Sequence, residues 1–597
     1  MYFLKHYSLK QIKINVIKLI SYIRQRLTPH QFIILSSIIV GFVAGLVAIS
    51  LKFFVHTIYK TFIAEKLQDQ SPSIIFYPFI GLLLTVLFTV YFLKGNLERG
   101  IPNVLYEIAR KSGFVKRHKV YSQFITSAIT VGLGGSAGLE GPIVVTGAAI
   151  GSNIAAELQW GYKERVLLLG CGAAAGIAAV FNAPIAGMMF AIEILIADIS
   201  VASFAPLAIA AACGMLCSTI AFHEEALFNF TLQQKFDYTN VPFYFLLAGF
   251  TAFVSLFYSK TVHLIEHFFE SFGNRRYTKL LVGGLLLTIL IYTTPTLFGE
   301  GYAAIKQIAE GKANFFYTRW SDWFHLNKEW TIVIILAFTM LLKAAATTLT
   351  LSAGGNGGNF APSLFVGAHA GFLFSRVFNL LHIHNLPESN FTMVGMAGVL
   401  SGVMYAPLTA IFLIAEITGG YDLMIPLMIV SSISFAVARH FEPYSMETRK
   451  LASKGEIFTQ NRDQNILLQI KLDALIETDI KSIFVEQNLG DLVRIISQSQ
   501  RNIFAVTDIE NIFVGVIMLD DVREIMFQTE LYAVVKIKQL MHKAPAILKM
   551  TDEMSNVMSQ FEKTDAWNLP VVDAEGKYIG FISKSAVFSH YRSKLTN

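Results

Sequence analysis

The chain has 597 residues, of which 54% are hydrophobic and 15% charged, and its mean hydropathy is +0.52. A soluble core of this size does not require so much apolar surface, so the composition excludes a wholly soluble protein and indicates a polytopic membrane protein. The net charge of +6 is modest, and we interpret the basic loops as facing anionic lipid rather than nucleic acid. The three cysteines stand in apolar sequence without partner histidines, which indicates neither a metal site nor a disulfide.

The N-terminal segment, residues 1–30, is basic and amphipathic and lacks the design of a signal peptide. The positive-inside bias therefore predicts a cytoplasmic N-terminus. A transmembrane domain is predicted over residues 31–454, with apolar spans that include 32–54, 74–93, 243–256, 280–292 and 332–342. Shorter apolar runs between them are broken by Gly and Pro, so several helices must stop partway through the bilayer. Such breaks are tolerated where the backbone lines a polar cavity, which favours a transport protein over a simple anchor.

The stretch from Gly134 to Pro142 places one carboxylate, Glu140, among four glycines and a proline. Glycine weakens a helix interior and proline belongs in the first turn, so a helix is predicted to begin near Pro142. The free backbone N–H groups at a helix start, together with the positive end of the helix dipole, suit an anion. The stretch is therefore predicted to be an anion site in which Glu140 is a built-in competitor.

The same plan recurs in the second half of this domain. The sequence Gly138-Leu139-Glu140-Gly141-Pro142 is matched 220 positions later by Gly358-Asn359-Phe360-Ala361-Pro362. An Ala-Pro step with a glutamate nine residues after the proline also occurs twice, and the two glutamates are Glu193 and Glu416. Two matches in the same order predict a duplicated bundle, and repeats of inverted topology would aim their broken helices at one midplane site. We interpret Glu193 and Glu416 as structural hydrogen-bonding groups rather than proton carriers.

The last part of the chain, residues 455–597, is more polar, and the apolar spans end before it. Short β-branched runs alternate with helical stretches, and this pattern occurs twice. Two similar α/β modules of roughly 60 residues each are therefore predicted, each small enough to need the other for a stable core. The predicted fold class is thus an α-helical polytopic membrane domain with broken helices, followed by a soluble α/β pair.

Three motifs stand in the order, and roughly at the spacing, of the CLC family of chloride channels and chloride/proton antiporters. They are Arg99-Gly100-Ile101-Pro102, Gly138-Leu139-Glu140-Gly141-Pro142 and Gly358-Asn359-Phe360-Ala361-Pro362. Gly299-Glu300-Gly301-Tyr302, Lys343 and the glycine run at 354–358 support them. The chain resembles this family from about residue 30 to its end, and its tail resembles the tandem CBS domains that many members carry on the cytoplasmic side. The resemblance implies a homodimer with one pore per subunit, in the inner (plasma) membrane with both termini cytoplasmic.

The resemblance also implies roles for individual residues. Glu140 matches the gating carboxylate, which occupies an anion site when ionised and swings away when protonated. The three motifs would line the path of the halide with Arg99, Gly100, Ile101, Pro102, Gly138, Leu139, Gly141, Pro142, Asn359, Phe360 and Ala361. The chemistry of helix N-termini agrees with this assignment. They offer partial positive charges that replace the water around an anion without binding it as tightly as a full charge would.

The sequence departs from the family pattern on the inner side. Where the family often has a serine that offers its hydroxyl to the ion, this chain has Arg99. Arg99 is expected either to place a cation near the inner mouth or to pair with Glu98 or Glu442, because an unpaired buried guanidinium is costly. The position of the inner proton-accepting glutamate of antiporters, directly after Glu193, holds Ile194, and an alkyl group does not relay a proton.

The inner gate and the tail depart from the pattern as well. Glu447 stands where many members have a gating tyrosine, and Tyr444 lies three residues earlier, about one helical turn, so both are candidates for the inner gate. CBS modules that bind adenine nucleotides usually pair a Ser or Thr with an Asp three residues later. Here one copy keeps only Asp521 and the other only Ser583, which favours a dimerisation and gating-support role without nucleotide.

These patterns predict an anion transport protein that needs no cofactor and has chloride as its default substrate. Ile194 and Glu447 favour a passive channel gated by voltage or pH, with a chloride/proton antiporter as the alternative and fluoride specialisation less favoured. A CBS-regulated divalent-cation transporter would need acidic side chains along the midplane, where only Glu140 is a candidate. The duplicated broken helices argue against a membrane-anchored nucleotide sensor, and the sequence shows no catalytic triad or Walker loop of an enzyme.

Overall fold

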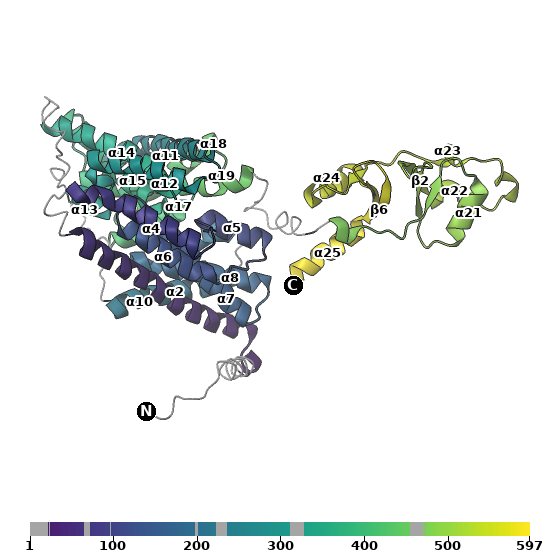
Figure 1. Ribbon diagram of the computed structural model, residues 1–597, viewed down its shortest axis with the longest axis horizontal. Coiled ribbons are helices and arrows are strands. Elements are labelled where there is room, and N and C mark those ends of the chain that lie inside the picture. The colour runs from purple at the N-terminus through teal and green to yellow at the C-terminus, as the bar shows by residue number, and fades with distance from the viewer. Residues whose placement is uncertain are drawn as a thin grey trace. The chain divides into compact units, whose positions relative to one another are not determined.

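The computed structural model describes residues 24–64, 72–95, 97–196, 201–222, 236–310, 328–453 and 472–596, together with Tyr22 and Ile470. The chain divides into two compact units, Met1–Gln460 and Asn461–Asn597 (Figure 1). Most of the predicted basic segment 1–30 and the predicted domain boundary at residues 454 and 455 lie outside the described residues, so both stay predictions.

The first unit is built from helices. Its first half contains α2 (Pro29–Tyr59), α4 (Tyr77–Tyr91), α5 (Ile101–Arg110), α6 (His118–Gly132), α7 (Glu140–Glu157), α8 (Tyr162–Phe181), α9 (Pro184–Phe190) and α10 (Val201–Phe222). Its second half contains α11 (Val241–Glu270), α12 (Arg276–Thr293), α13 (Tyr302–Ala309), α14 (Lys328–Ser352), α15 (Phe360–Leu380), α16 (Glu388–Met404), α17 (Pro407–Ile417), α18 (Met424–Phe441) and α19 (Met446–Ser453). Among the described residues, eight helices are long and apolar enough to cross a membrane. Every span predicted from the sequence overlaps one of these eight, so the predicted spans are confirmed.

The helix starts follow the glycines and prolines of the sequence. The short helices α9 and α17 each begin with a proline, whose missing N–H is not needed in a first turn. They have 7 and 11 residues and are too short to cross a bilayer, which takes about 20. The helix predicted to begin near Pro142 begins at Glu140, so the carboxylate belongs to the first turn of α7.

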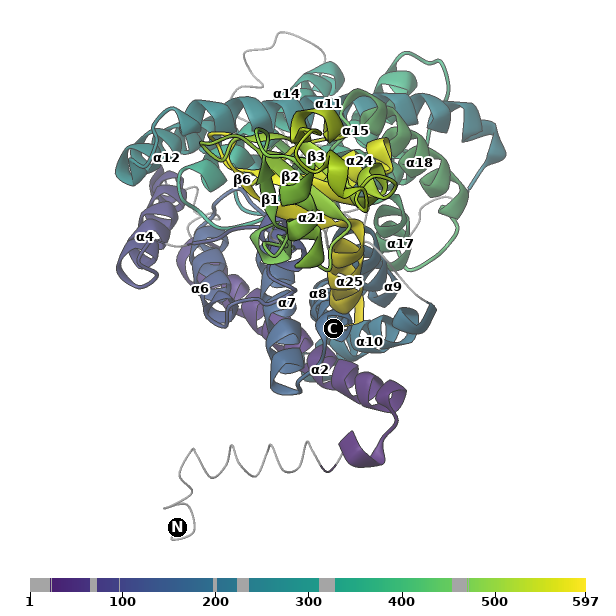
Figure 2. The ribbon, with the colours of Figure 1, turned by 90° about the vertical axis from the view of Figure 1, so that its right-hand side faces the viewer.

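The two halves of the first unit pack in matching pairs. α7 lies against α8 (Figure 2) as α15 lies against α16, and the short helices α9 and α17 pack on each other. Glycines at matching positions permit these close approaches: a Cβ on Gly147 would collide with the Gly172 carbonyl, and one on Gly367 would lie 2.6 Å from the Gly395 carbonyl oxygen. The duplicated bundle predicted from the sequence is therefore confirmed.

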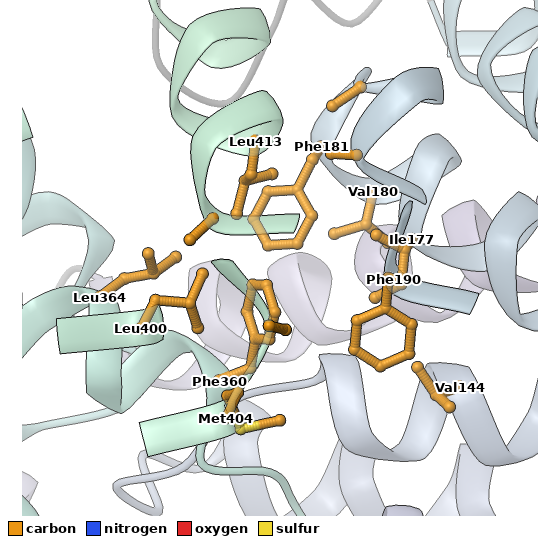
Figure 3. Packing of buried hydrophobic residues seen from close by; sticks show 14 of the residues in the cluster. Val144, Ile177, Val180, Phe181, Phe190, Phe360, Leu364, Leu400, Met404 and Leu413 are labelled. Carbon is orange, nitrogen blue, oxygen red and sulfur yellow. The ribbon is translucent and has the colours of Figure 1, made fainter. Parts of the chain in front are cut away.

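An apolar core joins the two halves. Phe360, from the second half, packs against Phe181 and Phe190 of the first half, with ring centroids 5.6 and 6.1 Å apart (Figure 3). Leu400 and Met404 of α16 lie near the same ring. Because aromatic side chains bury large apolar areas, this contact fixes the start of α15 against the ends of α8 and α9.

The second unit contains two modules with the same order of elements. The first has β1 (Ser482–Phe484), α21 (Leu489–Ser497), β2 (Ile503–Thr507), β3 (Phe513–Met518) and α22 (Leu519–Val522); the second has β4 (Leu548–Lys549), α24 (Met554–Thr564), β5 (Asn568–Val572), β6 (Tyr578–Ser583) and α25 (Lys584–Thr596). In each module the first strand pairs with the second in parallel, and the second pairs with the third antiparallel. Ile480, Ala505, Val516 and Phe581 form one buried cluster shared by the modules. The predicted pair of α/β modules is confirmed.

Candidate functional site

Two glycine loops meet where α7 and α15 begin. The Gly138 N–H donates to the Gly358 carbonyl at 2.9 Å, and the Gly358 N–H donates to the Gly138 carbonyl at 2.8 Å. A Cβ on Gly358 would lie 2.8 Å from the Gly141 nitrogen, so this crossing requires glycine. The reciprocal pair holds the N-termini of two helices, and hence their positive dipole ends, close together.

Polar side chains of α6 support the loop that precedes α15. The Asn356 side-chain amide donates to Gln123 Oε1 at 2.9 Å and to Thr126 Oγ1 at 2.7 Å. The Asn356 backbone N–H donates to Thr130 Oγ1 at 3.0 Å. Because all four residues are buried, these bonds hold the loop in one conformation before any ion arrives.

Glu140 is the first residue of α7 and is 1% exposed. One carboxylate oxygen accepts a short hydrogen bond from the Tyr302 hydroxyl. The other has no hydrogen-bond partner within the described part of the chain. It would collide with a Cβ placed on Gly138, and the Ala361 backbone N–H at the start of α15 acts on the carboxylate. The carboxylate therefore lies beside the N-terminus of α15 as well as that of its own helix.

A buried cation lies close to the same loops. Lys343 of α14 is fully buried, and its ammonium group donates to Ser136 Oγ at 3.0 Å and to the Gly299 carbonyl at 2.9 Å. It also lies 4.9 Å from the centre of the Phe365 ring, within range of a cation–π interaction. Lys343 and Glu140 both interact electrostatically with Glu300, so the region carries charge of both signs.

The predicted anion-binding residues of the second repeat open α15. Asn359 is the residue before the helix, and its side-chain oxygen accepts a hydrogen bond from the Tyr258 hydroxyl at 3.1 Å. Phe360 and Ala361 are the first two helical residues and are both buried. Their N–H groups are among those that a helix start leaves without helical acceptors.

The first motif caps α5. Gly100 precedes the helix with φ 74°, a left-handed conformation that favours glycine, and Ile101 and Pro102 form its first turn. Arg99 turns to the end of α14, where it donates to the Leu351 carbonyl at 2.8 Å and the Gly354 carbonyl at 3.0 Å. A cation there is favourable, because the C-terminal end of a helix is negative.

The alternative that Arg99 pairs with Glu98 or Glu442 is wrong. In the described residues Glu98 lies 2.5 Å from Lys119, and Glu442 lies 3.2 Å from Arg449. The carbonyl groups at the end of α14 instead provide the guanidinium with acceptors, which sequence pattern does not reveal. The alternative that Arg99 raises anion occupancy at the inner mouth stays a prediction.

The two candidates for the inner gate lie in different environments. Glu447 is in the first turn of α19 and is 9% exposed. Tyr444 precedes that helix and is 54% exposed. α19 packs on α5, and Glu447 is the buried one of the two candidates.

In the tail, both residues kept from the nucleotide motif have protein partners. Asp521 accepts the Met518 N–H at 2.7 Å, and its carboxylate lies 3.3 Å from a ring nitrogen of His542. The Ser583 hydroxyl donates to Glu477 at 2.7 Å. A carboxylate beside Ser583 is unfavourable for a phosphate group, because the two would repel each other.

The sequence patterns assigned no role to two tyrosines of the site. Tyr302 had a local signal, since it directly follows the Gly-Glu-Gly motif, and Gly301 takes φ 94° to begin α13. Tyr258 had none, because it lies in the middle of an apolar helix and becomes 1% exposed. Both tyrosines contact helix starts that are distant in sequence.

Comparisons with known proteins agree with this geometry. The family model described as voltage gated chloride channel matches residues 81–439, and the CBS domain model matches residues 537–593. The ClcB-like chloride channel protein of Ralstonia nicotianae is 28% identical over 399 residues, which cover 66% of this chain and 86% of that protein. The voltage-gated ClC-type chloride channel ClcB of Escherichia coli O81 is 28% identical over 325 residues, which cover 53% of this chain and 71% of that protein.

Three solved structures share the fold. A slow cyanobacterial Cl⁻/H⁺ antiporter superposes with TM-score 0.61 at 19% identity, over 72% of this chain and 98% of that one. A CLC-type fluoride/proton antiporter gives TM-score 0.57 at 22% identity, over 70% of this chain and 97% of that one. A eukaryotic CLC transporter gives TM-score 0.58 at 16% identity and covers 95% of this chain and 98% of that one.

Proposed function

Because the chain belongs to the voltage gated chloride channel family, the CLC family, we propose that it carries chloride through a pathway that Glu140 opens and closes. Family membership makes the protein a membrane transport protein rather than an enzyme. The observation that carries the proposal is the position of the buried Glu140 carboxylate, beside the N-termini of both α7 and α15. This is where partial positive charges from two helices converge.

Competition between the Glu140 carboxylate and chloride for the same site explains how one carboxylate gates the pathway. When ionised, Glu140 takes the place of the halide at the helix starts, and the Tyr302 hydroxyl holds it there. When protonated, it loses the charge that attracts it to these dipoles and leaves the site to chloride. The backbone N–H groups of Gly141, Phe360 and Ala361 then bind the ion weakly enough for it to move on.

We propose a passive channel as the mode of transport. Ile194 provides no proton-accepting group on the inner side. Its neighbour Glu193 has both carboxylate oxygens engaged, one by the Leu408 N–H at 2.9 Å and the other by the Thr409 N–H at 2.7 Å. A carboxylate bonded in this way is suited to holding a helix start. Chloride/proton exchange is the alternative, because proteins named as antiporters share the fold.

Reconstituted vesicles test the gate. Chloride efflux through the wild type is expected to rise as the outer pH falls, and the Glu140→Gln variant, which imitates the protonated state, is expected to conduct at every outer pH with little dependence on it. Glu157→Gln is the matched control, since Glu157 lies at the other end of α7 and is 47% exposed. If Glu140→Gln kept the pH dependence of the wild type, Glu140 would not be the gate.

The same vesicles distinguish channel from antiporter. With a chloride gradient and no pH gradient, a passive channel moves no protons uphill. A pH change inside the vesicles that depends on the chloride gradient and persists when the membrane potential is clamped would reject the channel and establish exchange.

Assembly and orientation complete the proposal. We propose a homodimer in the inner (plasma) membrane with cytoplasmic termini, supported by the family resemblance and by the basic character of residues 1–30. We further propose that the tandem CBS domains support gating without adenine nucleotide, because Ser583 is bonded to Glu477.

A further inference from the structure

Glu447 is a buried carboxylate at the start of α19. Its side chain lies in the first turn of α19, is 9% exposed, and forms no hydrogen bond or ion pair in the part of the chain that the structure describes. It does not cap the helix either, because the Thr448 N–H donates to Ser445 Oγ at 3.3 Å. Lys450 acts on Glu447 electrostatically, but its ammonium group lies 3.0 Å from Glu266, so the Glu447 charge has no ion pair of its own among the described residues and is costly there.

One face of α11 connects the surroundings of Glu447 to the anion site. Tyr258, Val262 and Glu266 stand four residues apart and so share this face. Glu447 interacts electrostatically with Tyr258 and Glu266 of this face, and with Lys450 of its own helix. Towards the site, the Tyr258 hydroxyl donates to Asn359, directly before α15.

At the Glu266 end, this face of α11 approaches solvent. Glu266 is 32% exposed and lies 3.0 Å from Lys450 of α19. α19 is the last described helix before the soluble tail, so this end is on the side predicted to be cytoplasmic. Protons from that side can therefore reach Glu266, which interacts with Glu447.

Charge decides what Glu447 does to an anion. α19 packs on α5, whose first turn is predicted to line the pathway, and on α16. An ionised carboxylate there repels chloride, whereas a protonated one is neutral and lets it pass. The groups that interact with Glu447 electrostatically are Tyr258 and Glu266 on α11 and Lys450 on α19. The packed helices also carry Tyr106, Glu107 and Arg110 on α5, Glu388 on α16 and Arg449 on α19. Of these, Glu107 is paired with Lys119, Glu388 with Arg376 and Arg449 with Glu442.

We propose that Glu447 is a second gating carboxylate, which faces the cytoplasm and admits chloride when it has taken a proton from that side. The inference rests on the proposed chloride pathway and adds an inner gate to the outer gate at Glu140. It assigns each carboxylate to one side of the membrane, so the two gates respond to the pH of different compartments.

Chloride currents across a planar bilayer, with the pH of each side set separately, test the inner gate. At constant outer pH, the wild-type current is expected to rise as the cytoplasmic pH falls, by at most about tenfold per pH unit for one proton. Glu447→Gln is expected to conduct and to lose this dependence while it keeps the response to outer pH. Glu140→Gln is expected to lose the response to outer pH and to keep the response to cytoplasmic pH. Glu270→Gln, an exposed position on α11, is the control and keeps both responses.

Two results would overturn the inner gate. One is a Glu447→Gln variant that keeps the wild-type response to cytoplasmic pH, and the other is a folded Glu447→Gln variant that conducts no chloride. Glu447→Tyr, which restores the residue common in the family, is the second variant and is also expected to lose the response to cytoplasmic pH. A failure of the proposed function is distinguishable from a failure of the inner gate. It would appear as a Glu140→Gln variant whose response to outer pH equals that of the wild type.

Discussion

The helix starts of α7 and α15 share a backbone plan but differ in one side chain. Gly138 and Gly358 exchange backbone hydrogen bonds, and each stands two residues before its helix. The first residue of α7 is Glu140, whereas that of α15 is Phe360, which packs into the core between the halves. The duplicated backbone therefore provides the N–H donors for an anion twice, while the charge that can be switched is present once.

The glutamates at the C-terminal ends of the short helices, Glu193 directly after α9 and Glu416 in the last turn of α17, show the opposite case, in which both halves keep the same side chain. Glu416 accepts the N–H groups of Ile185 and Ala186 at 3.0 and 2.8 Å, at the start of α9. Glu193 accepts those of Leu408 and Thr409 at 2.9 and 2.7 Å, at the start of α17. Each half thus caps a helix of the other, and the predicted hydrogen-bonding role of both glutamates is confirmed.

Removing one cap is expected to give the largest loss of stability. Glu416→Ala leaves two part-buried N–H groups of α9 without acceptors, at about 1–3 kcal/mol each, so the free energy of unfolding should fall by about 2–6 kcal/mol. Unfolding of the purified protein in detergent, followed by circular dichroism, measures the loss.

The matched variant sharpens the comparison of the two halves. Glu193→Ala is expected to destabilise at least as much, because Glu193 also accepts the Thr409 hydroxyl at 2.7 Å. A Glu416→Ala variant as stable as the wild type would show that the caps do not hold the two halves together.

Much of the fold was predictable because its signals are local. Glycines and prolines mark helix starts, the apolar spans are continuous, and the 220-residue offset between Gly138 and Gly358 is written in the sequence. The start of α7 lies near Pro142 as predicted, two residues earlier, since Glu140 itself takes helical geometry. Local chemistry therefore predicts where helices break more reliably than which residue is first.

The partners of the site were not predictable, because they lie far apart in the chain. Tyr302 is 162 positions from Glu140, Tyr258 is 101 positions from Asn359, and Arg99 reaches a carbonyl 252 positions away. No spacing rule relates such residues, and only packing of the whole bundle brings them together. The same holds for Glu447, whose burial depends on the helices that surround α19.

A smaller effect, on chloride flux, is expected from removing the Tyr302 hydroxyl, which holds the Glu140 carboxylate. Tyr302→Phe removes the hydrogen bond to Glu140 and keeps the ring, which packs against Phe181. Loss of about 0.5–1.5 kcal/mol from the closed state should raise chloride flux at neutral pH by about twofold to tenfold. The flux assay in vesicles measures it, with Tyr292→Phe, on the exposed face of α12, as the control.

The direction of the change distinguishes two roles for Tyr302. An increased flux means that the hydroxyl stabilises the closed carboxylate, and this would sharpen the contrast between the charged start of α7 and the apolar start of α15. A decreased flux would mean that Tyr302 assists the passage of the ion, and it would contradict the proposed closed state.

The smallest effect on stability is expected in the tail. There the two repeats each keep a different half of the nucleotide motif, Asp521 in one and Ser583 in the other. Ser583→Ala removes the hydrogen bond to Glu477 and should lower the stability of the second unit by about 0.5–1.5 kcal/mol. Chloride flux should be the same with and without ATP, both in this variant and in the exposed control Thr551→Ala. If ATP raised the unfolding temperature of the wild type but not of Ser583→Ala, the hydroxyl would bind nucleotide despite Glu477, because ligand binding to the folded state alone stabilises it.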